Sequence, residues 1–72
     1  MGDGRTRYNK MVNLLKPLVG KTMHIDLISR KIKINIGTSD TLVRDTLRFM
    51  IDTGLIHEVK HMVFKIRSAE LE

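Results

Sequence analysis

The sequence predicts an α+β fold, with three helices and a small antiparallel hairpin in a single domain of 72 residues. The clearest sign is a helix at about residues 39–53, which has a hydrophilic outer face. Its apolar positions recur at helical spacing: Val43, Leu47, Met50 and Ile51. Ser39 can cap the start of this helix and Asp40 suits its first turn, whereas Gly54 can end it.

A second helical stripe predicts a first helix from about Thr6. Its apolar residues are Tyr8, Met11, Val12, Leu15 and Val19. Pro17 should end or kink this helix, because proline has no N–H to donate to the preceding turn. Residues 1–5 and 68–72 are expected to be flexible tails, which leaves residues 6–67 as the folded domain.

The C-terminal part predicts a hairpin over Leu55–Arg67, with Lys60 and His61 at its tip. Met62, Phe64 and Ile66 alternate with Val63, Lys65 and Arg67 on the returning strand. The elements together predict one shared hydrophobic core, made of Met11, Val12, Leu15, Ile28, Ile32, Val43, Leu47, Met50, Leu55, Phe64 and Ile66.

The third helix and the residues around it resemble the winged helix-turn-helix family. The residues that carry the resemblance are Gly37, Ser39, Val43, Arg44, Leu47, Met50 and Gly54-Leu55-Ile56. The resemblance extends over roughly Lys21–Arg67. Thr38, Leu42 and Asp45 depart from the family pattern, and these departures bear on base contacts more than on the fold.

The resemblance also implies a short strand at Lys21–His24 and a second helix that continues to about Lys33. Helical spacing supports that helix through Ile25, Ile28, Ile32 and Ile36. The stretch from Ile32 to Ile36 also alternates as a strand would, so the end of this helix is ambiguous from sequence. Residues 34–38 would then form the turn before the third helix.

The charge distribution favours a polyanionic partner. The net charge is +5, and residues 1–33 carry eight basic and two acidic side chains against five and six in residues 34–72. The alternative is that these charges only keep a small protein soluble.

The resemblance implies sequence-specific binding to double-stranded DNA by a small transcriptional regulator, from an archaeon or from its virus or plasmid. The third helix would enter the major groove, and the wing, about residues 56–67, would touch the backbone or the minor groove. The residues expected to face bases are Ser39, Asp40, Thr41, Arg44, Asp45 and Arg48. The residues expected at phosphates are Arg30, Lys31, Lys33, Lys60, His61, Lys65 and Arg67.

Two alternatives remain open from the sequence. Arg44 could pair with Asp40 and Arg48 with Asp52, four residues apart on a solvated helix. The domain could also be a protein-interaction winged helix within a larger assembly, since the fold serves both purposes. A homodimer is a further expectation, through Phe49 and Leu42 or through Tyr8 and Leu14, although these residues could simply complete the core.

Several function classes are not expected. The sequence has no phosphate-binding or hydrolase motif, so we expect neither an enzyme nor a cofactor. His57 and His61 would not converge on a hairpin and no cysteine could join them, so no metal site is expected. No small-molecule ligand is evident. The chain lacks an apolar run long enough for a membrane span and an N-terminal signal segment, which predicts a cytoplasmic protein.

Overall fold

The computed structural model describes residues 4–71, and the predicted tail positions 1–3 and Glu72 lie outside the described residues. Across residues 4–71 the fold is α+β, as predicted, with three α-helices, one short 3-10 helix and a three-stranded antiparallel sheet. In chain order the elements are α1 (Gly4–Leu15), η1 (Lys16–Leu18), β1 (Thr22–His24), α2 (Ile25–Asn35), α3 (Asp40–Thr53), β2 (Ile56–Lys60) and β3 (Val63–Ile66).

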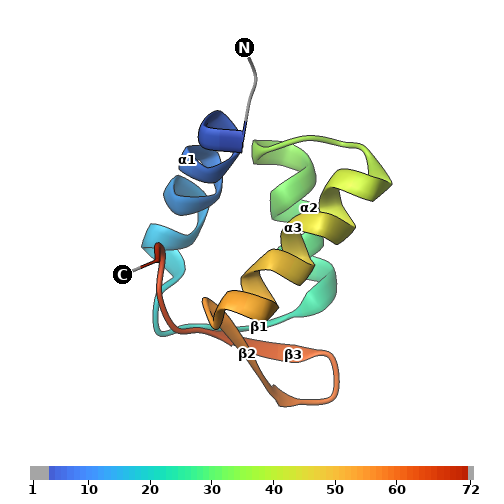
Figure 1. Cartoon of the computed structure of the whole chain (residues 1–72). Coiled ribbons are helices and arrows are strands. Elements are labelled where there is room, and N and C mark those ends of the chain that lie inside the picture. The colour runs from blue at the N-terminus through green and yellow to red at the C-terminus, as the bar shows by residue number, and fades with distance from the viewer. Residues whose placement is uncertain (1–3, 72) are drawn as a thin grey trace.

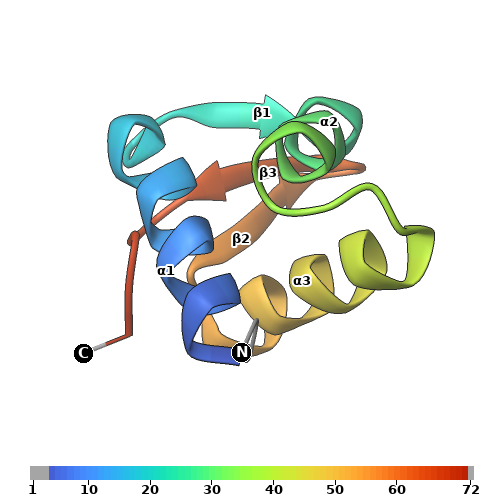
Figure 2. The same cartoon turned by 90° about the horizontal axis from the view of Figure 1, so that it is seen from above.

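The helices lie on one side of the sheet (Figure 1), and a view from above shows α1, α2 and α3 arranged around the core (Figure 2). The strand order is β1-β3-β2, so β3 is the central strand and pairs antiparallel with both neighbours. Phe64 of β3 lies opposite Met23 of β1 and Glu58 of β2. Alternation along β3 then points Phe64 and Ile66 toward the helices.

The predicted core is confirmed with few changes. Every residue expected there is buried except Leu47, which is half-buried against the core. Leu14 and Ile56 join the core as well, at 8% and 1% exposure. Ile56 belongs there because it begins β2 directly opposite the fully buried Ile66.

The first two helices differ from expectation at their ends. α1 begins at Gly4, two residues before the predicted Thr6. α2 continues to Asn35 and not only to Lys33, because the N–H of Ile36 still donates to the Ile32 carbonyl at 2.8 Å. The strand-like alternation at residues 32–36 was therefore misleading, and helical hydrogen bonding prevails there.

α3 starts and ends where the sequence predicts. The hydroxyl of Ser39 accepts a hydrogen bond from the N–H of Leu42 at 3.4 Å, which satisfies one of the free donors at the helix start. Gly54 ends the helix with a φ of 82°, in the left-handed region, and its N–H donates to the last turn.

The hairpin tip lies one residue later than predicted. Lys60 pairs with Val63, so His61 and Met62 form the tip in place of Lys60 and His61. An irregularity in the β2–β3 register between Glu58 and Lys60 inserts Val59 as an extra residue. Met62 adopts a positive φ of 64°. No Asn-Gly or Asp-Gly pair marks this turn, so its type was not readable from sequence.

Residues 68–71, expected to belong to a disordered tail, make specific contacts. The N–H of Ser68 donates to the Leu55 carbonyl at 3.2 Å, and Ala69 packs against the core. The N–H of Leu71 donates to the Tyr8 hydroxyl at 2.9 Å. The C-terminal segment thus returns along α1, and Figure 1 shows the chain ending beside that helix.

Candidate nucleic-acid interface

The outer side of α3 is the surface on which the sequence places the base-reading residues. The helix has 14 residues, which makes it about 21 Å long at about 1.5 Å per residue. Val43, Thr46 and Met50 are buried and hold the inner face against the rest of the domain. The opposite face is therefore left to solvent, and it carries the exposed side chains of Arg44 and Arg48.

Arg44 and Arg48 line the same shallow groove. The groove encloses about 300 Å³, and its other lining residues are Ile25, Leu47, Ile51 and Asp52. The arginines lie one turn apart, so both guanidinium groups belong to one flank of α3. An apolar floor beneath two cationic side chains suits a ligand with phosphate oxygens and flat, partly apolar edges.

The two arginines make no ion pair along their own helix. Within residues 4–71, the one contact closer than 4.0 Å between a basic and an acidic side chain joins His24 Nδ1 to a carboxylate oxygen of Asp26, at 3.6 Å. The pairing of Arg44 with Asp40 and of Arg48 with Asp52, which the sequence allowed, is not formed. Both guanidinium groups keep their donors available to a partner.

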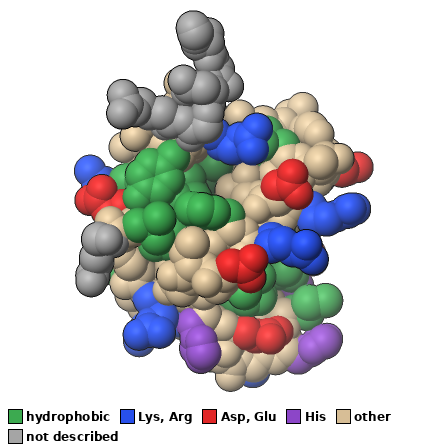
Figure 3. All heavy atoms as spheres, in the orientation of Figure 1, with side chains coloured by type: hydrophobic (Ala, Val, Ile, Leu, Met, Phe, Trp, Pro, Cys, Tyr) green, Lys and Arg blue, Asp and Glu red, His purple; other side chains and the backbone are tan. Residues whose placement is uncertain are grey.

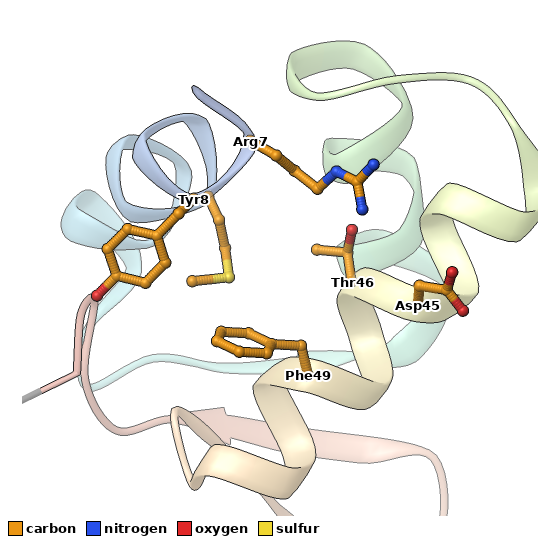
Figure 4. A pocket seen from close by; sticks show the side chains of 6 residues that line it. Arg7, Tyr8, Asp45, Thr46 and Phe49 are labelled. Atoms are coloured by element: carbon orange, nitrogen blue, oxygen red, sulfur yellow. The ribbon is translucent and has the colours of Figure 1, made fainter. Parts of the chain in front are cut away.

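Asp45 lies on the other flank of α3, away from this groove. It lines a pocket of about 260 Å³ between α1 and α3, together with Arg7, Tyr8, Met11, Thr46 and Phe49 (Figure 4). The ring centroids of Tyr8 and Phe49 are 6.4 Å apart, and their planes meet at 89°. The sequence grouped Asp45 with the arginines, but the structure separates them because α3 is flanked by different elements on its two sides.

The α1–α3 pocket is formed largely by packing. The Thr46 hydroxyl is 2.7 Å from the Leu42 carbonyl, so this buried polar group is satisfied within its own helix. The volume of the pocket, about 260 Å³, is smaller than the roughly 300–1,000 Å³ of typical ligand sites. We therefore treat this space as the seam between two helices.

The charge on α3 is mixed. The helix carries two arginines and three aspartates, so its formal charge is 2 − 3 = −1. Figure 3 shows acidic and basic side chains interspersed over this face, with an apolar area beside them. Any attraction of α3 for a polyanion must come from the positions of Arg44 and Arg48, since the net charge of the helix gives none.

The remaining predicted base-facing residues lie near the start of α3. Ser39, Asp40 and Thr41 are all exposed, with Ser39 also acting as the cap. The predicted phosphate contacts of the second helix are also accessible, since Arg30 and Lys33 are exposed and Lys31 is half-buried. α2 therefore presents these three cations close to the turn that leads into α3.

The basic residues of the hairpin do not share a face with the α3 arginines. Phe64 and Ile66 are buried on the helix side of β3, so Lys65, which lies between them, points to the opposite side of the sheet. Arg67 continues this alternation, and its N–H pairs with the Leu55 carbonyl at 2.8 Å. His61, at the tip, is exposed.

Sequence reasoning missed two residues that shape this region. His24 caps α2, and its Nδ1 accepts the N–H of Asp26 at 3.1 Å. Histidine is an infrequent cap, so no sequence signal marked this role. Asp52 lies in the arginine groove. The sequence signal for Asp52 is its position four residues after Arg48, which predicts an ion pair and not a shared groove.

The residues suggested for a homodimer contact are largely used within the chain. Leu14 is buried, and Tyr8 and Leu42 are half-buried. Phe49 is 38% exposed and packs edge-on against Tyr8. These side chains therefore contribute first to the joint between α1 and α3.

Within residues 4–71, no three histidine, cysteine or acidic side chains gather as metal ligands would. No helix in the same range is long and apolar enough to cross a membrane. Comparison of the chain with protein-family models, with curated proteins and with solved structures finds no match.

Proposed function

We propose that this protein is a winged helix-turn-helix domain that binds double-stranded DNA in a sequence-specific manner, as a small transcriptional regulator. The observation that carries the proposal is the pair Arg44 and Arg48, which are exposed one turn apart on α3 and have no acidic partner among residues 4–71. Arginine can donate two hydrogen bonds to a guanine edge in the major groove. α3 is the element that enters the groove in this proposal.

The other elements would fix the position of α3 on the duplex. Arg30, Lys31 and Lys33 on α2 would contact phosphates beside the turn between the helices, and the hairpin would reach the backbone through its tip at His61. Phosphate contacts of this kind carry no sequence information, but they set the register in which the α3 arginines meet the bases. The cytoplasmic location and the possibility of a homodimer remain predictions alongside this function.

A titration of duplex DNA at two salt concentrations tests the proposal. Affinity should fall with salt, at a log–log slope of about −0.9 for each phosphate contact. Arg44→Ala should cost about 1–3 kcal/mol on the preferred sequence, if Arg44 reads a guanine. Lys10→Gln is the matched control, because it removes one positive charge from the exposed face of α1. Equal losses in both variants would reject a reading role for Arg44.

The second candidate is a protein-interaction domain. It is favoured by the three aspartates of α3 and by Ile51, which is 42% exposed in the same groove as the arginines. An acidic helix with an exposed apolar residue suits a protein partner better than a phosphate backbone. Absence of duplex binding even at low salt would favour this candidate over the first.

A further inference from the structure

The outer face of the sheet presents basic side chains in paired rows. Lys65 on the central strand lies directly between Thr22 of β1 and His57 of β2. Because its neighbours Phe64 and Ile66 are buried on the helix side, this row faces away from the helices. In the next row, Val63 lies between His24 and Lys60.

The irregularity at Val59 places Lys60 on this outer face. Ile56 is buried on the inner face, so simple alternation along β2 would also point residue 60 inward. The extra residue shifts the phase of the strand, and Lys60 pairs with Val63. The bulge therefore turns a lysine from the core side to the outer side of the sheet.

The outer face has a more uniform charge than α3. Its exposed cationic residues are Lys60, Lys65 and Arg67, and His24 and His57 lie among them. The paired outward rows contain no carboxylate. Glu58 belongs to the row of Phe64, and its carboxylate accepts the N–H of Met62 at 3.1 Å. Asp26 lies beside His24, at the edge of the face.

We propose that this outer sheet face, defined by Lys60, Lys65 and Arg67, binds the phosphate backbone of a second duplex segment, so that one molecule bridges two duplexes. The inference rests on the proposed function, because α3 on the other side of the domain holds the first duplex. Lys65 points away from the helices, so a straight duplex that contacts α3 does not also lie across this face.

The chemistry of the face favours a duplex over a single strand. Single-strand surfaces combine cations with exposed aromatic rings on which bases stack. Phe64, the one phenylalanine, tyrosine or tryptophan of this sheet, is buried on the inner side, and the central outward position next to Lys65 and Lys60 is the half-buried Val63. The outward rings are the smaller imidazoles of His57 and of His24, whose Nδ1 is used to cap α2. Cations without a large aromatic platform suit the phosphates of a duplex, and binding to phosphates has no sequence preference.

The test uses the full chain and two short duplexes of mixed sequence, one labelled with a fluorescence donor and the other with an acceptor. Energy transfer on addition of protein reports bridging, and the anisotropy of one labelled duplex reports binding. Three double variants are compared with the unmodified chain: Lys60→Thr with Lys65→Thr on the sheet, Arg44→Ala with Arg48→Ala on α3, and Lys10→Gln with Lys16→Gln as the charge-matched control.

The sheet variant should lose energy transfer while it still binds one duplex, and the control should retain both signals. In the α3 variant, energy transfer should also disappear, because one of the two duplex sites is lost, while salt-dependent binding through the sheet remains. The log–log salt slope of that residual binding should fall by about 1.8 when the two sheet lysines are also removed. Threonine keeps the β-propensity of both positions, and circular dichroism checks that each variant is folded.

The outcomes separate the two proposals. Energy transfer that persists in the sheet variant would overturn the bridging inference, as would its absence in the unmodified chain. If the α3 variant binds like the unmodified chain while the sheet variant loses all binding, the proposed function of α3 fails and the sheet face stands as the duplex site.

Discussion

The backbone carbonyl of Met62 accepts a hydrogen bond from the N–H of Ile25 at 2.8 Å, and so ties the hairpin tip to the junction of β1 and α2. On its other side, the N–H of Met62 donates to the Glu58 carboxylate at 3.1 Å. These bonds hold a residue whose φ of 64° is costly for any side chain with a Cβ, by about 1–2 kcal/mol. The tip is therefore fixed to the domain at the expense of local strain.

Met62→Gly should raise the free energy of unfolding by about 0.5–1 kcal/mol, as measured by urea denaturation. Glycine removes the strain, and this gain exceeds the roughly 0.5–1 kcal/mol of backbone entropy that glycine loses on folding. The 41% exposed methionine side chain contributes little packing. His61→Gly is the control and should destabilise, because His61 is not in the left-handed region. A destabilised Met62→Gly variant would contradict this account of the tip.

Gly54→Ala should lower the free energy of unfolding by about 1 kcal/mol through backbone strain alone. Gly54 has a φ of 82°, and a Cβ there would meet no atom within 4 Å. The chain is short enough for chemical synthesis, which allows a precise control. D-alanine at position 54 favours positive φ, so it should match or exceed the stability of glycine. If L-alanine and D-alanine at position 54 destabilise the protein equally, the cause is a steric clash of the added methyl group and not backbone strain.

Gly37 tests the opposite case, in which space and not φ requires glycine. A Cβ on Gly37 would collide with a terminal methyl group of Leu42. Gly37→Ala should therefore cost about 1 kcal/mol, at the low end of the overpacking range, because the half-buried Leu42 side chain can rotate away from the new methyl group. In a Leu42→Ala background the same substitution should cost almost nothing, because the colliding atom is gone. A double-mutant cycle measured by denaturation should give a coupling of about 0.5–1 kcal/mol, and an additive result would reject the contact.

These positions show what local sequence chemistry could predict. Ser39 and Gly54 bracket α3 correctly, because a cap and a left-handed stop act within a few residues of their own position. The positive φ of Met62 and the bulge at Val59 were not predictable, since no glycine or asparagine marks either one. Their positions follow from pairing between β2 and β3 and from the Ile25 contact.

The candidate site was predictable only in part, for a similar reason. Helical periodicity placed Arg44, Asp45 and Arg48 outside the core, and all three are exposed. It could not tell which flank faces α1 and which faces the start of α2, so it grouped Asp45 with the arginines. Likewise, alternation along the strand predicted that Lys65 and Phe64 lie on opposite faces of the sheet. Only the placement of the helices fixes which of these faces is the outer one.

The two flanks of α3 allow a charge-matched test of where the duplex would lie. Asp52 shares a groove with Arg44 and Arg48, whereas Asp45 lines the seam beside α1. Under the proposed function, Asp52→Asn removes a repulsion from phosphates at the contact surface. An interaction of about 1 kcal/mol between charges in water corresponds to about a fivefold gain in duplex affinity at low salt.

Asp45→Asn changes the net charge by the same amount, so it should raise affinity clearly less than Asp52→Asn does. Fluorescence anisotropy with one labelled duplex measures both variants under the same conditions. Equal gains would mean that the duplex senses only net charge, and a larger gain from Asp45→Asn would place it on the α1 side. No change in either variant would point to a protein partner, because a surface that never meets phosphates has no repulsion for asparagine to relieve.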